Sequence, residues 1–202
     1  MAKIALITGI SGQDGAYLAK FLLKKKYKII GTVKKSSKSS YWRLERLGIK
    51  KKLTIEKMDL GNLKDIDKIF KKYDFDEVYN LAAQSFVNKS FNIPIATSNI
   101  TGLGTLRILE IIKKNNRKIK FYQASSSEMF GRVLNSEQSE TTPFNPQSPY
   151  AISKVFSHLI TKNYRNSYKI FATSGILFNH ESPLRGKEYV TRKIIIGLVK
   201  IY

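Results

Sequence analysis

Residues 3–23 read KIALITGISGQDGAYLAKFLL: an apolar run, a turn with three glycines, and apolar residues at helical spacing. The run predicts a buried strand, and the last segment predicts a helix. Between them, Gly9, Gly12 and Gly15 form G-x-x-G-x-x-G. Glycine permits a tight turn, close approach of the backbone to a pyrophosphate, and packing of the helix on the sheet. This context favours a dinucleotide-binding turn over the alternative, a tight βα turn without a ligand.

Strand and helix patterns alternate along the rest of the chain. Further strands are predicted over residues 27–33, 52–60, 76–83, 118–126 and 170–177, and further helices over residues 63–73, 99–115 and 148–168. This alternation predicts an α/β fold: a doubly wound, Rossmann-like parallel sheet with helices on both faces. Ligands of such sheets bind beyond the carboxyl ends of the strands, which is where the short polar motifs of this chain fall.

Composition narrows the class of protein. The chain has 202 residues, of which 42% are apolar, enough for one domain with a substantial core. It contains no cysteine, and its two histidines, His158 and His180, lie far apart in sequence. A disulfide framework is therefore excluded, and a metal centre is not expected. The N-terminal run MAKIALITGI has the length of a strand and lacks the features of a signal peptide, so we expect a cytoplasmic protein without a membrane span.

The formal net charge of +21 suits an anionic partner such as nucleic acid or a phosphorylated ligand. The lysines are nevertheless spread along the chain. The runs Lys24–Lys26 and Lys50–Lys52 fall where a helix should end or a loop should begin, and cations are common at such positions. No interleaving of aromatic and basic residues marks a single-strand groove. We expect a solvated basic surface and no nucleic-acid partner.

The predicted strand ends indicate which cofactor the turn would bind. After the second strand, Lys34, Lys35 and Ser36 stand where an NAD-binding chain usually has a carboxylate, which favours the 2′-phosphate of NADP. The alternative is a solvated basic loop. The third strand ends where an adenine would lie, and the fourth ends in small residues beside the cofactor path. The residues expected to contact the cofactor are Gly9, Gly12, Gln13, Asp14, Gly15, Lys34, Lys35, Ser36, Asp59, Leu60, Leu81, Ala82 and Ala83, together with Tyr150 and Lys154 further along the chain.

Tyr150 and Lys154 form Y-x-x-x-K on a predicted helix, which puts both side chains on one face. An ammonium beside a phenol stabilises the phenolate and lowers a pKa that is normally about 10. The pair could then act as a general base, and Ser126, at the end of a predicted strand, could bond the same substrate oxygen. Taken alone, a Tyr and Lys pair at this spacing usually marks a plain helix surface, but here it follows a nucleotide-binding turn and a strand that ends in serine, which favours an active site.

Taken in this order, the glycine turn, NLAA, the serine and Y-x-x-x-K resemble the extended short-chain dehydrogenase/reductase family, which acts on nucleotide-activated sugars. Within it, the chain resembles the GDP-mannose 4,6-dehydratases along its whole length. The segments that carry this resemblance include EVYNLAAQSFV, FYQASSSEMFG, ETTPFNPQSPYAISK and GILFNHESPLRG, and the pieces GQDG and NHESP are specific to that branch.

The resemblance implies a dehydratase that converts GDP-mannose to GDP-4-keto-6-deoxymannose, with internal hydride transfer through NADP and loss of water, on the route to GDP-fucose. It implies that Tyr150 takes the C4 hydroxyl proton, that Lys154 tunes Tyr150 and binds the ribose, and that Ser126 orients the C4 oxygen. Water loss needs one more acid–base group, and Glu128, two residues after Ser126, is the candidate. The alternative for Glu128 is a surface or capping carboxylate.

The resemblance also implies substrate contacts at Ser85, Asn179, Glu181 and Lys193, and a homo-oligomer, either dimer or tetramer. It divides the chain into an NADP-binding domain with the catalytic residues (1–177) and the beginning of a smaller substrate-binding domain (178–202), whose remainder is absent. The family commonly has arginine where Lys35 stands, which weakens the expected 2′-phosphate recognition. Two other functions stay open: an inactive NADP-binding fragment and a related sugar-nucleotide epimerase.

Overall fold

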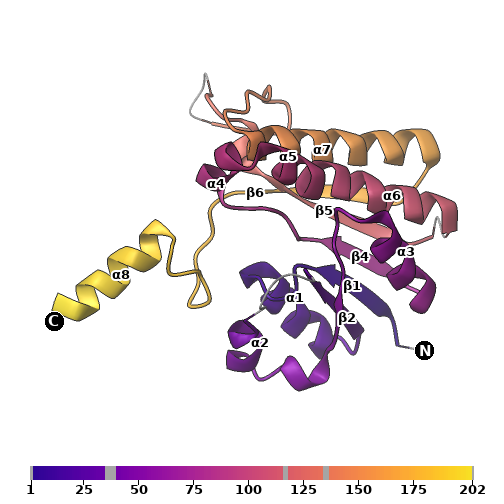
Figure 1. Cartoon of the computed structure of the whole chain (residues 1–202), viewed down its shortest axis with the longest axis horizontal. Coiled ribbons are helices and arrows are strands. Elements are labelled where there is room, and N and C mark those ends of the chain that lie inside the picture. Colours follow the sequence, from indigo (N-terminus) through magenta and orange to yellow (C-terminus); the bar gives the residue numbers. More distant parts are fainter. Residues whose placement is uncertain (1, 35–39, 116–117, 134–136, 202) are drawn as a thin grey trace.

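The computed structural model describes residues 2–34, 40–115, 118–133 and 137–201. Its strands form one parallel sheet in the order β3-β2-β1-β4-β5-β6, with helices on both faces (Figure 1). This arrangement confirms the predicted doubly wound α/β fold. The strands are β1 (Ile4–Thr8), β2 (Lys28–Val33), β3 (Thr54–Lys57), β4 (Glu77–Asn80), β5 (Lys120–Ser126) and β6 (Ala172–Leu177).

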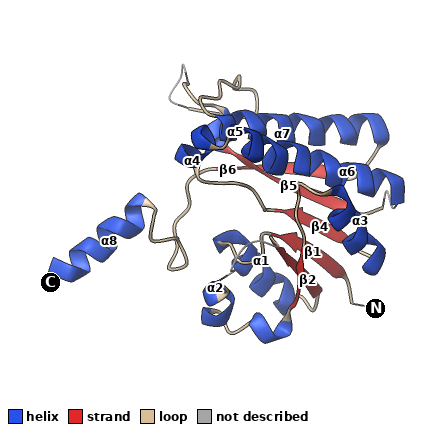
Figure 2. Cartoon of the chain, in the orientation of Figure 1, coloured by secondary structure: helices blue, strands red, loops and turns tan. Residues whose placement is uncertain are grey.

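The helices form two layers around the sheet (Figure 2). One face carries α1 (Gln13–Lys24) and α2 (Trp42–Arg46), and the other carries α3 (Leu63–Lys72), α6 (Leu103–Asn115) and α7 (Pro149–Tyr168). Shorter elements connect them: η1 (Lys50–Lys52), α4 (Val87–Asn92), α5 (Pro94–Thr97), the π-turn η2 (Ser98–Gly102) and η3 (Ser127–Met129).

Side-chain alternation along the strands divides the core in two. In β1, Leu6 faces α3, α6 and α7, whereas Ala5 and Ile7 face α1 and α2. All three are fully buried, as expected for a central parallel strand with helices on both sides. The two cores hold β1 rigidly, and its carboxyl end therefore has a fixed position.

The longest helix, α7, begins at a well-defined cap. Ser148 accepts a hydrogen bond from the amide of Ala151 at 3.0 Å, and Pro149 occupies the first helical position, where its missing N–H costs nothing. This cap sets the residue at which α7 begins, directly before Tyr150, and Lys154 follows one turn later. Both side chains are buried, at 8% and 4% exposure.

Several elements differ from the sequence-based expectation. The strand predicted over residues 52–60 extends only over β3, and the helix predicted over 99–115 begins as the π-turn η2, in a segment where Gly102 and Gly104 are weak helix formers. Helices α2, α4 and α5 lie where no helix was predicted.

The last helix, α8 (Val190–Ile201), stands away from the sheet in Figure 1 and has no buried residue. Its exposed apolar side chains are Val190, Ile194, Ile195, Leu198, Val199 and Ile201. Within the described ranges, none of the helices is both long and apolar enough to cross a bilayer.

An alanine pair tests this division between core and surface. Ile108 on α6 is fully buried, so Ile108→Ala should lower the free energy of unfolding by about 3 kcal/mol through lost burial and a residual cavity. Ile195 on α8 is 55% exposed, so Ile195→Ala should change it by less than about 0.5 kcal/mol. Urea unfolding followed by circular dichroism measures both, and equal losses would contradict this fold.

Candidate active site

Two cavities lie side by side at the carboxyl ends of the strands and share the glycine turn. The first, of about 420 Å³, is bounded by the end of β5, by α7 and by the loop of residues 178–189. The second, of about 410 Å³, is bounded by the ends of β2 and β3. Gly9, Gly12, Leu81 and Ala83 line both. An elongated ligand could therefore cross the turn and occupy both cavities.

The glycine turn has no room for side chains at two of its positions. A Cβ atom on Gly9, which has a positive φ of 70°, would lie 3.0 Å from the Cα of Ala82. On Gly15 it would lie 2.5 Å from the carbonyl oxygen of Gly9. The first bond within α1 runs from the amide of Ala16 to Gly12, so the N–H groups of residues 13–15 precede the helical ladder. Such a helix start favours a bound phosphate.

One buried hydroxyl joins β1 to β4 beneath this turn. Thr8 donates to Oδ1 of Asn80 at 2.8 Å and accepts the amide protons of Leu81 and Ala82, both at 3.0 Å. Its side chain is fully buried. Because the hydroxyl donates one hydrogen bond and accepts two, its bonding capacity is filled, and the spacing between the two strand ends is fixed.

The same network continues to Lys154. Asn80 donates to Oε1 of Gln123 at 2.7 Å, and Gln123 donates to the carbonyl of Ala124 at 2.9 Å. Lys154 donates to that same carbonyl through Nζ at 2.6 Å. Asn80 and Gln123, which the sequence analysis did not identify, thus help to orient the lysine. In the sequence, these two residues stand out only as polar side chains within strands that are predicted to be buried.

Burial shifts the pKa values of both Tyr150 and Lys154 on α7. It lowers the pKa of Lys154 to about 8, opposed by the nearby charge of Asp14. It raises the pKa of Tyr150 to about 12, opposed by the hydroxyl of Ser126. The expected lowering of the phenol pKa is thus not produced by these residues alone, because desolvation dominates. A cation placed in the first cavity would lower it.

The carboxylate lies on a tight turn beside the serine. β5 ends at Ser126, which caps η3 by accepting the amide proton of Glu128 at 3.3 Å. Ser126 is 9% exposed, whereas Glu128 is exposed. Both residues line the first cavity together with Tyr150 and Lys154. The structure thus brings the four residues expected to be catalytic to one cavity wall.

A loop after β6 closes the first cavity from the side of α1. Arg43 on α2, stacked on Trp42 at 4.6 Å, donates to the carbonyls of Leu184 at 2.7 Å and Ser11 at 3.2 Å. Burial lowers the pKa of this guanidinium, opposed mainly by the charge of Glu188. Arg43 therefore ties the loop to the glycine turn. No local pattern in the sequence predicts this role, because Arg43 and Leu184 lie 141 residues apart.

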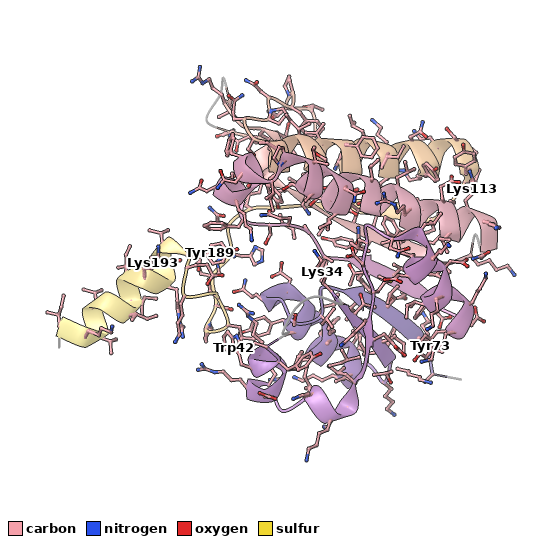
Figure 3. All side chains as sticks on the ribbon, in the orientation of Figure 1. Lys34, Trp42, Tyr73, Lys113, Tyr189 and Lys193 are labelled. Atoms are coloured by element: carbon pink, nitrogen blue, oxygen red, sulfur yellow. The ribbon has the colours of Figure 1, made fainter. Side chains whose placement is uncertain are left out.

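The other expected site residues are distributed as follows. The first cavity is lined by Gly9, Gly12, Gln13, Asp14, Gly15, Leu81, Ala83, Ser85 and Asn179. The second cavity is lined by Lys34, Asp59, Leu60 and Ala82, in addition to the residues that the two cavities share. Lys35 and Ser36 lie outside the described residues. Glu181 pairs with Arg185 at 3.5 Å and lines neither cavity. Lys193 lies on α8, away from the sheet (Figure 3).

The chain is similar in sequence to known proteins. A family model described as GDP-mannose 4,6 dehydratase matches residues 6–202. The GDP-mannose 4,6 dehydratase of Cricetulus griseus is 48% identical, over 99% of this chain and 56% of that protein. GDP-mannose 4,6 dehydratase 1 of Arabidopsis thaliana is also 48% identical, over 98% and 58%. The chain thus spans just over half the length of these relatives.

Solved structures share the fold. The UDP-N-acetylglucosamine 4-epimerase of Methanobrevibacter ruminantium M1, in complex with UDP-N-acetylmuramic acid, has a TM-score of 0.87 and 28% identity, over 98% of this chain and 63% of that one. The dTDP-glucose 4,6-dehydratase of Bacillus anthracis, in complex with NAD, has a TM-score of 0.83 and 23% identity, over 98% and 62%. The second likeness bears on the fold alone.

The buried lysine predicts how stability depends on pH. Between the folded pKa of about 8 and the unfolded value near 10.5, the unfolded chain binds more protons at Lys154, so the free energy of unfolding rises with pH in that window. Lys154→Met should remove this rise, which amounts to about 3 kcal/mol at most. Urea unfolding from pH 7 to pH 10 measures the difference between the two chains.

A lysine on the surface of the same helix provides the control. Lys162 is exposed, so Lys162→Met should leave the pH dependence unchanged. A difference between wild type and Lys154→Met that stays constant from pH 7 to pH 10 would show that the lysine keeps its ordinary pKa when buried.

Proposed function

The chain belongs to the GDP-mannose 4,6-dehydratase family, and from this membership we propose that it carries the cofactor site and the reacting groups of such an enzyme. The proposed reaction converts GDP-mannose to GDP-4-keto-6-deoxymannose with loss of water. The observation that carries the proposal is the position of Glu128, bonded through its amide to Ser126 in the cavity of Tyr150 and Lys154. Residues 1–177 would form the cofactor-binding domain, and residues 178–202 would begin a substrate-binding one.

The two joined cavities fit a nicotinamide dinucleotide. The glycine turn between them has close backbone packing and a helix start suited to a pyrophosphate. In the second cavity, Oε1 of Gln84 is buried and has no hydrogen-bond partner among the described residues, so it can accept a hydroxyl or amino proton of a ligand. When bound, the nicotinamide would supply the reversible hydride transfer that the reaction needs.

We assign the cofactor as NADP. Lys34 lines the second cavity at the end of β2, where NAD-binding folds usually carry an acidic residue for the ribose hydroxyl. An ammonium there favours a 2′-phosphate over a hydroxyl. Lys35 and Ser36, which follow it in sequence, are assigned to the same phosphate.

Tyr150, Ser126 and Lys154 would act at C4 of the mannose. Ser126 holds the C4 hydroxyl, and Tyr150 accepts its proton as C4 becomes a ketone. Lys154, fixed on the carbonyl of Ala124, provides positive charge next to Tyr150, with Nζ 5.7 Å from the centre of its ring. Burial keeps water from competing for the proton.

Glu128 would perform the elimination. The C4 ketone acidifies the proton on C5, and the carboxylate of Glu128 removes it. The same group then returns this proton to the C6 hydroxyl, which leaves as water, so that acid and base are regenerated. Hydride lost from C4 would be returned to C6, and the proton that Tyr150 took from the C4 hydroxyl would be returned to C5, so that the net change is loss of one water. An exposed carboxylate on a tight turn can reach both positions without a change in the sheet.

We place the nucleotide sugar in the first cavity against Ser85 and Asn179, with Glu181 and Lys193 as further contacts. A homo-oligomer is part of the same proposal. An epimerase is the second candidate, supported by the 28% identity and TM-score of 0.87 to an archaeal UDP-N-acetylglucosamine 4-epimerase. An epimerase needs Tyr150 and Ser126 but no base at C5, so Glu128 separates the two functions.

Substitution of the carboxylate is the main test. Glu128→Gln should lower formation of a product lighter by one water about 10²- to 10⁴-fold, because the C5 proton loses its base. Reduction of the bound cofactor by GDP-mannose should persist. Mass spectrometry of the nucleotide sugar and absorbance of the reduced nicotinamide measure the two steps.

The matched control is Glu140→Gln, an exposed carboxylate outside both cavities, which should leave water loss unchanged. Unchanged water loss in Glu128→Gln would refute its role. Epimerised product without a lighter one would favour the second candidate. NADP binding without any turnover by the wild-type chain would favour the remaining alternative, a chain that binds the cofactor but is inactive.

A second substitution tests the cofactor assignment. Lys34→Ala should weaken NADP binding about tenfold, through loss of one charge-assisted contact, and should change NAD binding by less than about twofold. Lys28→Ala, at the opposite end of β2, is the control. Isothermal titration calorimetry with both nucleotides gives the ratio, and equal losses for NADP and NAD would argue against a 2′-phosphate at Lys34.

A further inference from the structure

The loop after β6 is tied to the first turn of α1 through side chains that the sequence analysis had given to the cofactor. Gln13 donates through Nε2 to the carbonyl of His180 at 3.2 Å and accepts from the hydroxyl of Ser182 at 2.8 Å. Oδ1 of Asp14 lies 2.7 Å from Nε2 of His180. The side chains of Gln13 and Asp14 therefore bind the loop, which leaves their backbone N–H groups to bind a phosphate.

His180 lies between two hydrogen-bond acceptors. Its Nδ1 is 2.8 Å from the carbonyl oxygen of Phe178, and its Nε2 is 2.7 Å from the carboxylate of Asp14. A carbonyl and an ionised carboxylate can only accept, whereas a neutral imidazole carries a single N–H. Both contacts are satisfied together only when the ring is doubly protonated.

The charges around His180 support this state. The Phe178 carbonyl and then the Asp14 carboxylate raise the pKa of His180, whereas partial burial and the charge of Arg185 lower it. Arg185 is itself balanced by Glu181 at 3.5 Å. Other charged or titratable groups around the cavity are Arg43 on α2, Glu128 on η3, Tyr150 and Lys154 on α7, and Glu188 and Tyr189 on the loop.

We propose that His180 is a positioning residue that acts as a proton-dependent latch: its protonated ring holds residues 178–182 on the first turn of α1 and neutralises Asp14 there. Asn179 lies in sequence between Phe178, whose carbonyl the ring contacts, and His180, which carries the ring. The latch therefore fixes Asn179 at the wall of the first cavity. When the proton leaves, one of the two bonds is lost and Asp14 stands uncompensated beside the glycine turn.

An uncompensated carboxylate at a helix start that receives phosphate would repel the ligand. Opening the latch should therefore weaken phosphate-bearing ligands as well as free the loop. This consequence for ligands rests on the proposed function, whereas the latch itself is a property of the chain alone. The two are tested separately.

Nitrogen-15 labelling of the imidazole rings tests the latch directly. The chain has only two histidines, and the spectrum of His180→Gln identifies the signals of the other, His158. Burial lowers the pKa of His158, whose Nδ1 lies 3.0 Å from the hydroxyl of Ser125. In the wild-type chain without ligand, we expect His180 to titrate above the ordinary value of about 6.5, and at a higher pH than His158.

Amide hydrogen exchange gives the second readout. Protection of residues 178–186, corrected for the intrinsic pH dependence of exchange, should fall about three- to tenfold as His180 loses its proton. Asp14→Asn should lower the midpoint of this change. Asp67→Asn removes the same charge from a distant ion pair on α3, with Lys71 at 2.6 Å, and should leave it unchanged.

Titration of His180 at or below pH 6.5 would overturn the latch. Amide protection of the loop that stays constant as His180 loses its proton would also overturn it. Both measurements need only the wild-type chain. NADP binding is then measured across the same pH range. A latch that titrates as expected while NADP fails to bind would leave the latch in place and count against the proposed function. Tight NADP binding with no histidine titration in the loop would do the reverse.

Discussion

Three hydrogen bonds to one hydroxyl set the geometry on which the site depends. Thr8 closes the gap between β1 and β4, the two strands at which the strand order reverses and a crevice opens above the sheet. Gly9 follows directly and approaches Ala82 so closely that no side chain fits between them. A shift of β4 against β1 would therefore deform the glycine turn and, through Asn80, move the carbonyl that holds Lys154. The shape of both cavities therefore depends on the spacing between β1 and β4.

Local patterns explain which features the sequence could predict. Strand and helix periods, the glycine triplet and the spacing of Tyr150 and Lys154 all lie within short stretches, and the structure forms each of them. Helices α2, α4 and α5 have between four and six residues, too few for a helical period to appear. The partners of Gln13 and Asp14 lie more than 160 residues away, so no local signal could show that their side chains bind a loop. For the same reason the approach of Arg43 to Leu184 could not be predicted.

Burial favours the neutral form of both Tyr150 and Lys154, so it moves the two pKa values apart: it raises the pKa of Tyr150 to about 12 and lowers the pKa of Lys154 to about 8. Glu128 differs, since its turn leaves the carboxylate in contact with water. The cavity thus combines two buried groups, Tyr150 and Lys154, whose pKa values respond to any charge that enters, with an exposed carboxylate, that of Glu128. Such an arrangement keeps the phenol inert until a ligand changes its surroundings.

Leu184 lies near the end of the described chain and packs into the core on the face of the sheet that carries α1 and α2. Its side chain is 1% exposed and packs in the cluster formed by β1, β2, α1 and α2, all of which are complete before residue 60. On the ribosome, where chains grow at roughly 5–20 residues per second, that cluster must wait on the order of ten seconds for its final side chain. During this interval an apolar slot stays open beside the glycine turn of the nascent protein. Molecular chaperones that recognise exposed aliphatic surface would meet this protein there, before its loop has been synthesised.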